Sequence, residues 1–225
     1  MQTFLPLLFV YDEDKTLLEN LQDYFAKVAS MMDRQRTGKQ RVEAMQLLDV
    51  LLSRKPLSSW KNHPATKMWS PWPEALKLYH NMFIQEWIKR GYKNTMKLEK
   101  IDENKIEEQG VPEFLTNRHF IERMQANLLS KDVDFYGEYG WQVQPATGYF
   151  WLVEGKYHLV IDKKKTEFDL SGDEPLTLAP LPSPLCRRPV APSVNIRSNP
   201  VKRVQRRTCI PLSEYDNYKK SIKQT

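Results

Sequence analysis

Four basic side chains fall within eight consecutive residues, at the entrance of an expected helix. They are Arg34, Arg36, Lys39 and Arg41. A helix entrance offers free backbone N–H groups and the positive end of the helix dipole, so cations placed there attract phosphate groups. Two residues further on, the carboxylate of Glu43 could stabilise a positive charge that develops on a substrate. A solvated run of surface charges and an ordinary ion pair are the alternative interpretations of these residues.

A histidine lies in the segment WKNHPATKMW, between an asparagine and a proline. This residue, His63, could donate to phosphate or act as an acid or base near neutral pH, and no second His or Cys stands at a spacing that would complete a metal site. Trp60, Trp69 and Trp72 could stack on unpaired bases or complete a hydrophobic core. Further basic residues follow the next expected helix, where they either extend the basic surface or complement the helix dipole. They are Lys89, Arg90, Lys93, Lys97 and Lys100.

Several catalytic motifs are missing from the sequence. It contains no glycine-rich phosphate loop, no G-x-S-x-G, no Cys-x-x-Cys and no H-E-x-x-H, which disfavours nucleoside triphosphate hydrolysis, serine esterase chemistry and zinc chemistry. The two cysteines, Cys186 and Cys209, are too few for a disulfide framework or a structural metal site, so a reducing compartment is expected. We therefore expect neither a cofactor nor a metal.

The net charge of +6 over 225 residues is unevenly distributed. Residues 186–225 carry ten basic and two acidic side chains, a net charge of +8, which leaves −2 for the first 185 residues. A nucleic-acid contact on the main body must therefore be a local patch. The apolar opening MQTFLPLLFV has no basic region before it, and no apolar run approaches the ~20 residues that cross a bilayer. We expect an intracellular protein, in the cytoplasm or nucleus, with neither a secretion signal nor a membrane segment.

Helices are needed to position these side chains. Apolar residues recur at helical spacing in four segments, which predict helices over residues 15–32, 39–53, 74–90 and 116–130. The stretch SSWKNHPATKMWSPWP, with three prolines and three tryptophans, is expected to be an ordered loop. The charged stretch MKLEKIDENKIEEQG is expected to be a solvated connection with at most a short helical turn.

The character of the sequence changes after Tyr136. YFWLV and KYHLVI flank Glu154-Gly155, which predicts a β-hairpin with a two-residue turn. Residues 175–211 contain eight prolines and no glycine, a composition typical of an extended segment. The sequence thus predicts a mainly α protein, a compact helical domain with an appended β-hairpin and a proline-rich basic C-terminal tail. The expected parts are a helical domain over 1–141, the hairpin over 142–174 and the tail over 175–225.

The chain contains, in this order, GKQRVEAMQLL, WKNHPATKMW, ALKLYHNMFIQEWIKRGYKN and NLLSKDVDFYGEYGW. Their order and spacing resemble the pyrimidine dimer DNA glycosylase family of the endonuclease V type, specifically its larger bacterial and viral branch. The resemblance covers residues 1–10 and 31–141. It implies a compact all-α domain that binds duplex DNA, kinks it and flips a base out of the stack.

The resemblance also implies a mechanism. In the family, the terminal α-amine attacks the sugar C1′, forms a Schiff base and allows β-elimination of the strand, while a glutamate stabilises the sugar cation and shuttles protons. An α-amine has a pKa of about 7.7–8.0, so it is partly neutral at physiological pH. Because Gln2 is bulky, Met1 is expected to be retained and to supply this amine, and Glu43 is by position the carboxylate. The residues expected to contact DNA are Arg34, Arg36, Lys39, Arg41, His63, Lys67 and Arg90.

Besides the bulky Gln2, three features depart from the family pattern. Residues 18–32 are expected to be an insertion, Met124, Gln125 and Ala126 stand where a polar His-Arg-Ser stretch is expected, and everything after residue 142 lies outside the resemblance. The leading hypothesis is a DNA repair N-glycosylase with abasic-site lyase activity on ultraviolet-type pyrimidine dimers in double-stranded DNA. The alternative is a non-enzymatic DNA- or protein-binding module on the same helical scaffold, with the basic tail as the contact for a protein partner.

Overall fold

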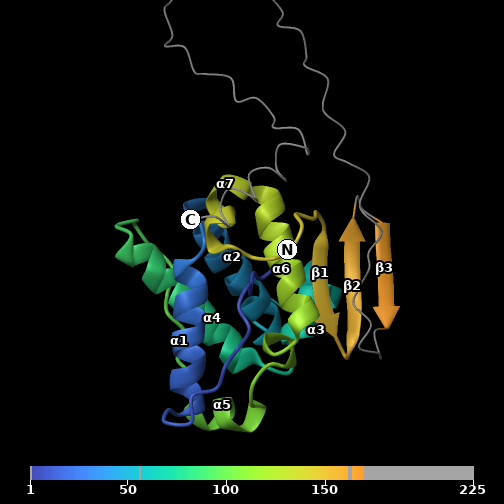
Figure 1. Cartoon of the computed structure of the whole chain (residues 1–225). Helices are drawn as coiled ribbons and strands as arrows, with labels where there is room; N and C mark the ends of the chain where they lie inside the picture. Colours follow the sequence, from blue (N-terminus) through green and yellow to red (C-terminus); the bar gives the residue numbers. More distant parts are fainter. Residues whose placement is uncertain (1, 56, 162–163, 170–225) are drawn as a thin grey trace, which may run out of the picture. The chain divides into compact units, whose positions relative to one another are not determined.

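A computed structural model describes residues 2–55, 57–161 and 164–169 (Figure 1). Within these residues, seven α-helices precede a three-stranded sheet. The helices are α1 (Leu17–Ser30), α2 (Arg34–Leu51), α3 (Pro64–Trp69), α4 (Pro73–Lys89), α5 (Glu103–Gln109), α6 (Arg118–Lys131) and α7 (Val133–Tyr136). Short 3-10 turns lie at η1 (Ser59–Asn62), η2 (Glu113–Leu115) and η3 (Gly137–Tyr139). The fold is mainly helical, as expected, while Met1 and the expected tail over 175–225 lie outside the described residues.

Polar caps fix the starts of α1 and α6. Thr16 accepts a hydrogen bond from the backbone N–H of Glu19 at 3.2 Å, and the Glu19 carboxylate accepts one from Thr16 N–H at 2.9 Å, which together form a capping box before α1. Asn117 caps α6 by accepting from Phe120 N–H at 2.9 Å. Helices α1, α4 and α6 confirm three of the four helices expected from the apolar pattern.

The fourth expected helix, α2, begins five residues earlier than predicted. Asp33 is its cap and accepts from the backbone N–H of Arg36 at 3.0 Å, so Arg34 and Arg36 lie in the first turn of α2 and not ahead of it. Helix α2 packs against α4. A Cβ at Gly38 would lie 2.9 Å from a ring carbon of Trp87. The glycine of the GKQR motif therefore permits the close approach of these two helices.

Two segments that we expected to be irregular contain helices. The tryptophan-rich stretch forms η1 and α3, because Pro64 occupies the first helical position, where its missing N–H costs nothing, and His63 caps the helix. The charged connection forms α5, which Asp102 caps. The expectation of a loop was wrong at α3 because it treated proline only as a helix breaker.

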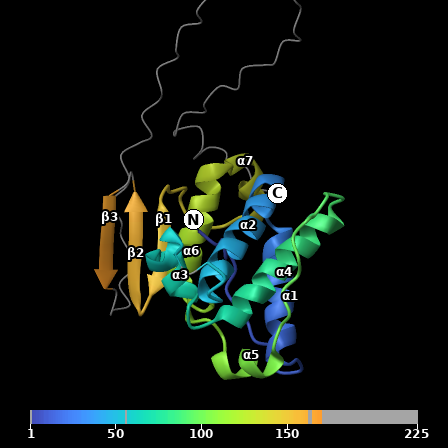
Figure 2. The ribbon, with the colours of Figure 1, turned by 180° about the vertical axis from the view of Figure 1, so that it is seen from behind.

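The sheet is antiparallel and consists of β1 (Tyr149–Val153), β2 (Lys156–Ile161) and β3 (Lys164–Asp169) in that order. Glu154 and Gly155 form the turn between β1 and β2, with φ of 52° and 73°, as a type I′ turn requires. The predicted hairpin is confirmed, and β3 is an additional strand that we did not expect. Strand β1 lies against α3 and α6, and β3 is the edge farther from the helices (Figures 1 and 2).

A single hydrophobic core contains residues of the helices and of the sheet. Trp69 and Tyr79 are among its largest fully buried side chains. From β1, Phe150 stacks on Phe120 of α6 with their ring centroids 6.1 Å apart. Because β1 shares the core with α6, its residues have a fixed position relative to that helix. No helix in the described part of the chain has the length and apolar character needed to cross a membrane.

Residues 2–6 are buried although they form no regular secondary structure. A buried backbone of this kind must find hydrogen-bond partners among side chains. Gln40 of α2 accepts from the N–H of Phe4 at 3.0 Å, and Gln125 of α6 donates to the carbonyl of Pro6 at 2.7 Å. Helices α2 and α6 therefore hold the start of the chain against the core.

Candidate functional site

A pocket of about 190 Å³ lies beside Glu43. Four parts of the chain line it, namely the N-terminal segment, α2, the end of α6 and the first residue of β1. The lining residues are Gln2, Phe4, Gln35, Arg36, Lys39, Gln40, Glu43, Lys131 and Tyr149. We call this the Glu43 pocket, since side chains from distant parts of the sequence converge there on one carboxylate.

Glu43 is 8% exposed, and its carboxylate is held by N–H donors. Its Oε2 accepts from Nε2 of Gln40 at 3.0 Å and from the backbone N–H of Gln2 at 3.4 Å. Its Oε1 lies 3.7 Å from the ammonium nitrogen of Lys39, which is exposed. The carboxylate is thus fixed between the start of the chain and a cation at the surface.

Gln40 is the residue that orients this arrangement. Its Oε1 accepts from the hydroxyl of Tyr79 at 2.5 Å and from Phe4 N–H at 3.0 Å, and its Nε2 donates to the Gln2 carbonyl at 3.0 Å as well as to Glu43. A side-chain amide has two donors and two lone pairs, and all four are used here. Burial raises the pKa of Tyr79, which keeps its hydroxyl a donor. Gln40 therefore couples the position of Glu43 to that of the N-terminal segment.

Three cations line the Glu43 pocket, and one of them was missed by the sequence analysis. Arg36 and Lys39 were expected, whereas Lys131 comes from the last turn of α6. Lys131 is exposed, and its ammonium nitrogen lies 5.9 Å from the ring centroid of Tyr149. Burial, and then the positive charges of Arg36 and Lys39, lower the pKa of Lys131. A lysine at a helix C-terminus usually complements the helix dipole, so only tertiary structure reveals its place beside Glu43.

A larger pocket of about 550 Å³ adjoins the Glu43 pocket along the first turns of α2. The two pockets share Gln35 and Arg36, and we call their combined lining the α2 groove. Arg34 is exposed in it, with its guanidinium carbon 5.1 Å from the ring centroid of Tyr92. The α2 groove therefore brings together Glu43 and three of the predicted phosphate contacts, which are Arg34, Arg36 and Lys39.

Two other predicted contacts, Arg41 and Arg90, are engaged inside the protein and do not line the α2 groove. The guanidinium of Arg41 lies 4.1 Å from the ring centroid of Trp87 and donates to Asn94 at 2.9 Å. Arg90 uses all five N–H donors of its guanidinium, four of them on residues 29–37, where α1 ends and α2 begins. Its acceptors are Glu86 Oε1, Thr37 Oγ1 and the carbonyls of Ala29, Ser30 and Met32. The sequence alone does not distinguish such internal cations from exposed ones.

His63 and Lys67 lie at α3, outside the lining of the α2 groove. Nδ1 of His63 accepts from Ala65 N–H at 3.1 Å, and its ring meets Trp60 and Trp151 edge to face at centroid distances of 4.9 and 5.2 Å. Burial lowers the pKa of His63 to about 4, so its imidazole is neutral at pH 7. Lys67 is exposed. A neutral His63 can donate one hydrogen bond but brings no positive charge to a phosphate.

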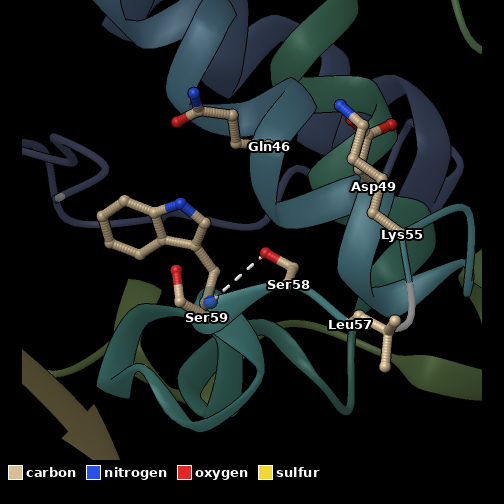
Figure 3. Close-up of a pocket in the computed structure, with 7 residues that line it drawn as sticks. Gln46, Asp49, Lys55, Leu57, Ser58 and Ser59 are labelled. Atoms are coloured by element: carbon tan, nitrogen blue, oxygen red, sulfur yellow. Dashed lines mark hydrogen bonds and ion pairs between the residues drawn. The ribbon is translucent and has the colours of Figure 1, made fainter.

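A third pocket, of about 540 Å³, lies between the C-terminal part of α2 and η1 (Figure 3). We call it the Trp60 pocket, and its lining residues are Gln46, Asp49, Lys55, Leu57, Ser58, Ser59 and Trp60. Its carboxylate, Asp49, is paired with Lys55 at 2.5 Å, and Ser58 Oγ accepts from Trp60 N–H at 3.2 Å. Trp60, which the sequence suggested could stack on bases, lines this pocket, but none of the expected catalytic or DNA-contacting residues does.

The chemistry of the Glu43 pocket follows from its charges. A fixed carboxylate can stabilise positive charge that develops on a bound substrate, and the surrounding cations can hold phosphate groups beside it. Among the described residues, no group of three or more His, Cys, Asp or Glu side chains is placed to hold a metal ion. The side chains that are present suit a sugar-phosphate substrate.

Comparison with known proteins connects this geometry to a family. The model of the pyrimidine dimer DNA glycosylase family matches residues 14–100, a segment that contains Glu43 and every predicted DNA contact. The matched segment includes residues 18–32, which we expected to be an insertion, and it ends before Lys131 and Tyr149. No curated protein and no solved structure matches the chain. Over residues 14–100 the chain is therefore similar to the pyrimidine dimer DNA glycosylase family.

Proposed function

We propose that the protein excises ultraviolet-type pyrimidine dimers from duplex DNA as an N-glycosylase and then cuts the strand at the abasic site through an amine Schiff base. The family supports the glycosylase activity. The observation that carries the finer proposal is the hydrogen bond between the backbone nitrogen of Gln2 and the carboxylate of Glu43, at 3.4 Å. It brings the start of the chain and the proposed catalytic carboxylate to one place.

The proposed nucleophile is the α-amine of Met1, a residue outside the described ones. Met1 is joined to the Gln2 nitrogen, and one residue spans at most about 3.6 Å. Chain connectivity therefore keeps an amine on Met1 within reach of a sugar ring that also contacts Glu43. An α-amine is a suitable nucleophile because its pKa is lower than that of an ordinary lysine. A larger fraction of the α-amine is therefore neutral at pH 7.

The proposed reaction begins when the amine attacks C1′ as the bond from C1′ to the base breaks. The base leaves with the bonding electrons and takes up a proton. After the amine nitrogen has lost a proton, the C1′–O4′ bond opens, O4′ is protonated and the Schiff base forms. Removal of a C2′ proton then expels the 3′ phosphate and cuts the strand. Glu43 stabilises the positive charge of the sugar in the first step and carries protons in the later ones.

The departures from the expected family pattern in α6 support this arrangement. The side chain of Gln2 donates to Sδ of Met124 at 3.0 Å, and Gln125 donates to the carbonyl of Pro6 at 2.7 Å. Met124 and Gln125 thus take part in holding the N-terminal segment beside α2. A sequence that differs here from the expected polar stretch can therefore still position the proposed amine.

The decisive experiment uses the full-length protein and two duplexes of the same sequence, one with a single thymine dimer and one with an abasic site. We expect strand cleavage at the dimer, and a covalent protein–DNA adduct when borohydride is added to the abasic duplex, since borohydride reduces the imine. Peptide mapping of the adduct should locate the modification at Met1. A protein that binds both duplexes but gives neither cleavage nor adduct would be the non-enzymatic binding module that the sequence left open.

We further propose that residues 186–225, which lie outside the described ones, add sequence-independent phosphate contacts through their net charge of +8. Deleting them should weaken binding to any duplex and flatten the dependence of log K on log salt concentration, while the preference for dimers persists. Binding and salt dependence that stay unchanged would argue instead for a protein partner of this proline-rich segment.

A further inference from the structure

Two of the three cations that line the Glu43 pocket are paired with carboxylates. Nη1 of Arg36 lies 2.6 Å from Oδ2 of Asp33, and the ammonium of Lys39 lies 3.7 Å from Oε1 of Glu43. Within the described residues, no hydrogen bond or ion pair engages the ammonium of Lys131. Among these residues, Lys131 is therefore the cation of the pocket that remains available to an anion of the substrate.

The ammonium of Lys131 has a defined place on the pocket wall. It lies 5.8 Å from the ring centroid of Phe4 and 5.9 Å from that of Tyr149. Such distances permit cation–π attraction, which holds an ammonium without a carboxylate that would neutralise it. Phe4 is itself fixed, since its N–H donates to Gln40 at 3.0 Å. The cation is thus held beside the N-terminal segment.

The backbone that carries Lys131 is fixed where α6 meets α7. The N–H of Asp132 donates to the carbonyl of Leu128 at 3.1 Å, which closes the last turn of α6. The side chain of Asp132 accepts from the N–H of Phe135 at 3.1 Å and so caps α7. The position of the Lys131 backbone is therefore set by both helices.

The charges and the size of the pocket indicate which anion Lys131 can meet. Burial, and then the positive charges of Arg36 and Lys39, lower the pKa of Lys131, and a phosphate beside the ammonium would offset this repulsion. At about 190 Å³ the Glu43 pocket is smaller than the roughly 300 Å³ at which pockets for drug-sized ligands begin, so it suits a single sugar. A phosphate that Lys131 meets there is one that is attached to the reacting sugar.

We propose that Lys131 holds the phosphate on the 3′ side of the reacting sugar and stabilises it as it leaves. Lys131 lies outside the segment that the family model matches. The inference rests on the proposed function, and it assigns to Lys131 the cutting of the strand and not the release of the base.

The elimination step shows why a cation is useful at this phosphate. Glu43 takes the proton from C2′, the C2′–H electron pair forms the C2′–C3′ double bond, and the C3′–O3′ bond breaks. The electrons of that bond pass to O3′, so the leaving phosphate gains one negative charge. A cation beside it interacts more strongly in this transition state than in the imine that precedes it, and such an interaction raises the rate.

The first test follows two rates on a duplex with one abasic site, at protein concentrations that saturate the DNA. Borohydride added at successive times measures imine formation, and gel analysis without borohydride measures strand cleavage. We expect full-length Lys131→Gln to lose about 10- to 100-fold in the cleavage rate, while its rate of imine formation stays near that of the wild type. Lys131→Arg keeps the charge and should retain both rates.

Lys27→Gln is the matched control. Lys27 is also an exposed lysine in the last turn of a helix, α1, and it lines none of the three pockets described above. Its substitution removes the same charge, so both rates should remain unchanged.

The second test removes the charge from the DNA instead. An uncharged methylphosphonate replaces the phosphate on the 3′ side of the abasic site, or the one on its 5′ side in a second duplex. The difference in cleavage rate between wild type and Lys131→Gln should largely disappear on the 3′-substituted duplex and persist on the 5′-substituted one. A difference that persists on the 3′-substituted duplex would overturn the assignment to the leaving phosphate.

The outcomes separate this inference from the proposed function. A wild-type protein that neither forms the adduct nor cuts the strand overturns the proposed function and this inference with it. An active wild type with equally fast cleavage by Lys131→Gln overturns the inference alone. Equal losses of imine formation and cleavage in Lys131→Gln would make Lys131 a part of the pocket structure or the nucleophile itself, which also overturns the inference.

Discussion

The Glu43 pocket and the Trp60 pocket both use residues of α2, but their carboxylates have different surroundings. In the Trp60 pocket, Asp49 pairs at 2.5 Å with Lys55, and all lining residues come from positions 46–60. In the Glu43 pocket, the carboxylate accepts from two N–H donors and the nearest cation is 3.7 Å away, while the lining residues come from positions 2–149. The Trp60 pocket is nearly three times larger, at about 540 against 190 Å³. Volume alone therefore does not select the Glu43 pocket as the candidate site, whereas the convergence of distant polar groups does.

The largest expected effect comes from blocking the terminal amine, which is the proposed nucleophile. Acetylating Met1, or leaving an uncleaved extension before it, should abolish the borohydride adduct with abasic DNA. DNA binding should be nearly unchanged, because the exposed cations of the α2 groove remain. Gel analysis of trapped complexes checks both results. Equal trapping by blocked and free protein would move the nucleophile to a lysine, with Lys39 and Lys131 as the candidates in the pocket.

The second largest effect is expected from neutralising Glu43, and the same change at Asp49 serves as the comparison. Glu43→Gln keeps the shape of the side chain and removes its charge, so we expect a loss of about 10²-fold or more in glycosylase rate with little change in affinity. Asp49→Asn is the matched control in the Trp60 pocket, and it should leave the rate unchanged. Single-turnover cleavage of dimer-containing duplex measures both variants. A Glu43→Gln protein of wild-type rate would remove Glu43 as the catalytic carboxylate and leave the similarity to the family intact.

The elements that the sequence predicted well are those with strong local signals. The apolar spacing along α1, α4 and α6 located these helices within two residues at each end, and Glu154-Gly155 identified the turn of the hairpin. Local rules also explain the errors. Asp33 was not recognised as the cap of α2, and Pro64 was taken as a break although it starts α3.

The candidate site was predictable only in part, for a different reason. Arg36, Lys39 and Glu43 lie within eight residues on one helix, so their proximity was evident from the sequence. Lys131 and Tyr149 reach the same pocket through the packing of α6 and β1 on α2 and the N-terminal segment, which no local pattern encodes. Tertiary contacts likewise decide that a cation such as Arg90 points inward.

A smaller effect tests the distinction between exposed and internal arginines. Arg34→Ala should lower the slope of log K against log salt concentration by about 1, because one exposed phosphate contact is lost. Its free energy of unfolding should hardly change. Arg90→Ala should show the opposite pattern, a loss of about 2–3 kcal/mol in the free energy of unfolding with an unchanged salt slope, since five internal hydrogen bonds disappear. Salt titrations and urea unfolding of both variants measure the two quantities, and a lower salt slope for Arg90→Ala would show that it reaches DNA.

The smallest effect concerns His63, whose ring contacts Trp60 and Trp151. Burial lowers its pKa in the folded protein to about 4, from an ordinary value of 6.5. Between these two pH values the unfolded chain binds more protons, so His63 makes the protein less stable as the pH falls from 6.5 toward 4. His63→Asn keeps a side chain that can cap α3 and removes the titration. Urea unfolding near pH 7.5 and near pH 5 should therefore show a larger loss of stability on acidification for the wild type than for His63→Asn. Equal losses would mean that the imidazole can be protonated in the folded state without cost, and then the ring could not be buried between the two tryptophans.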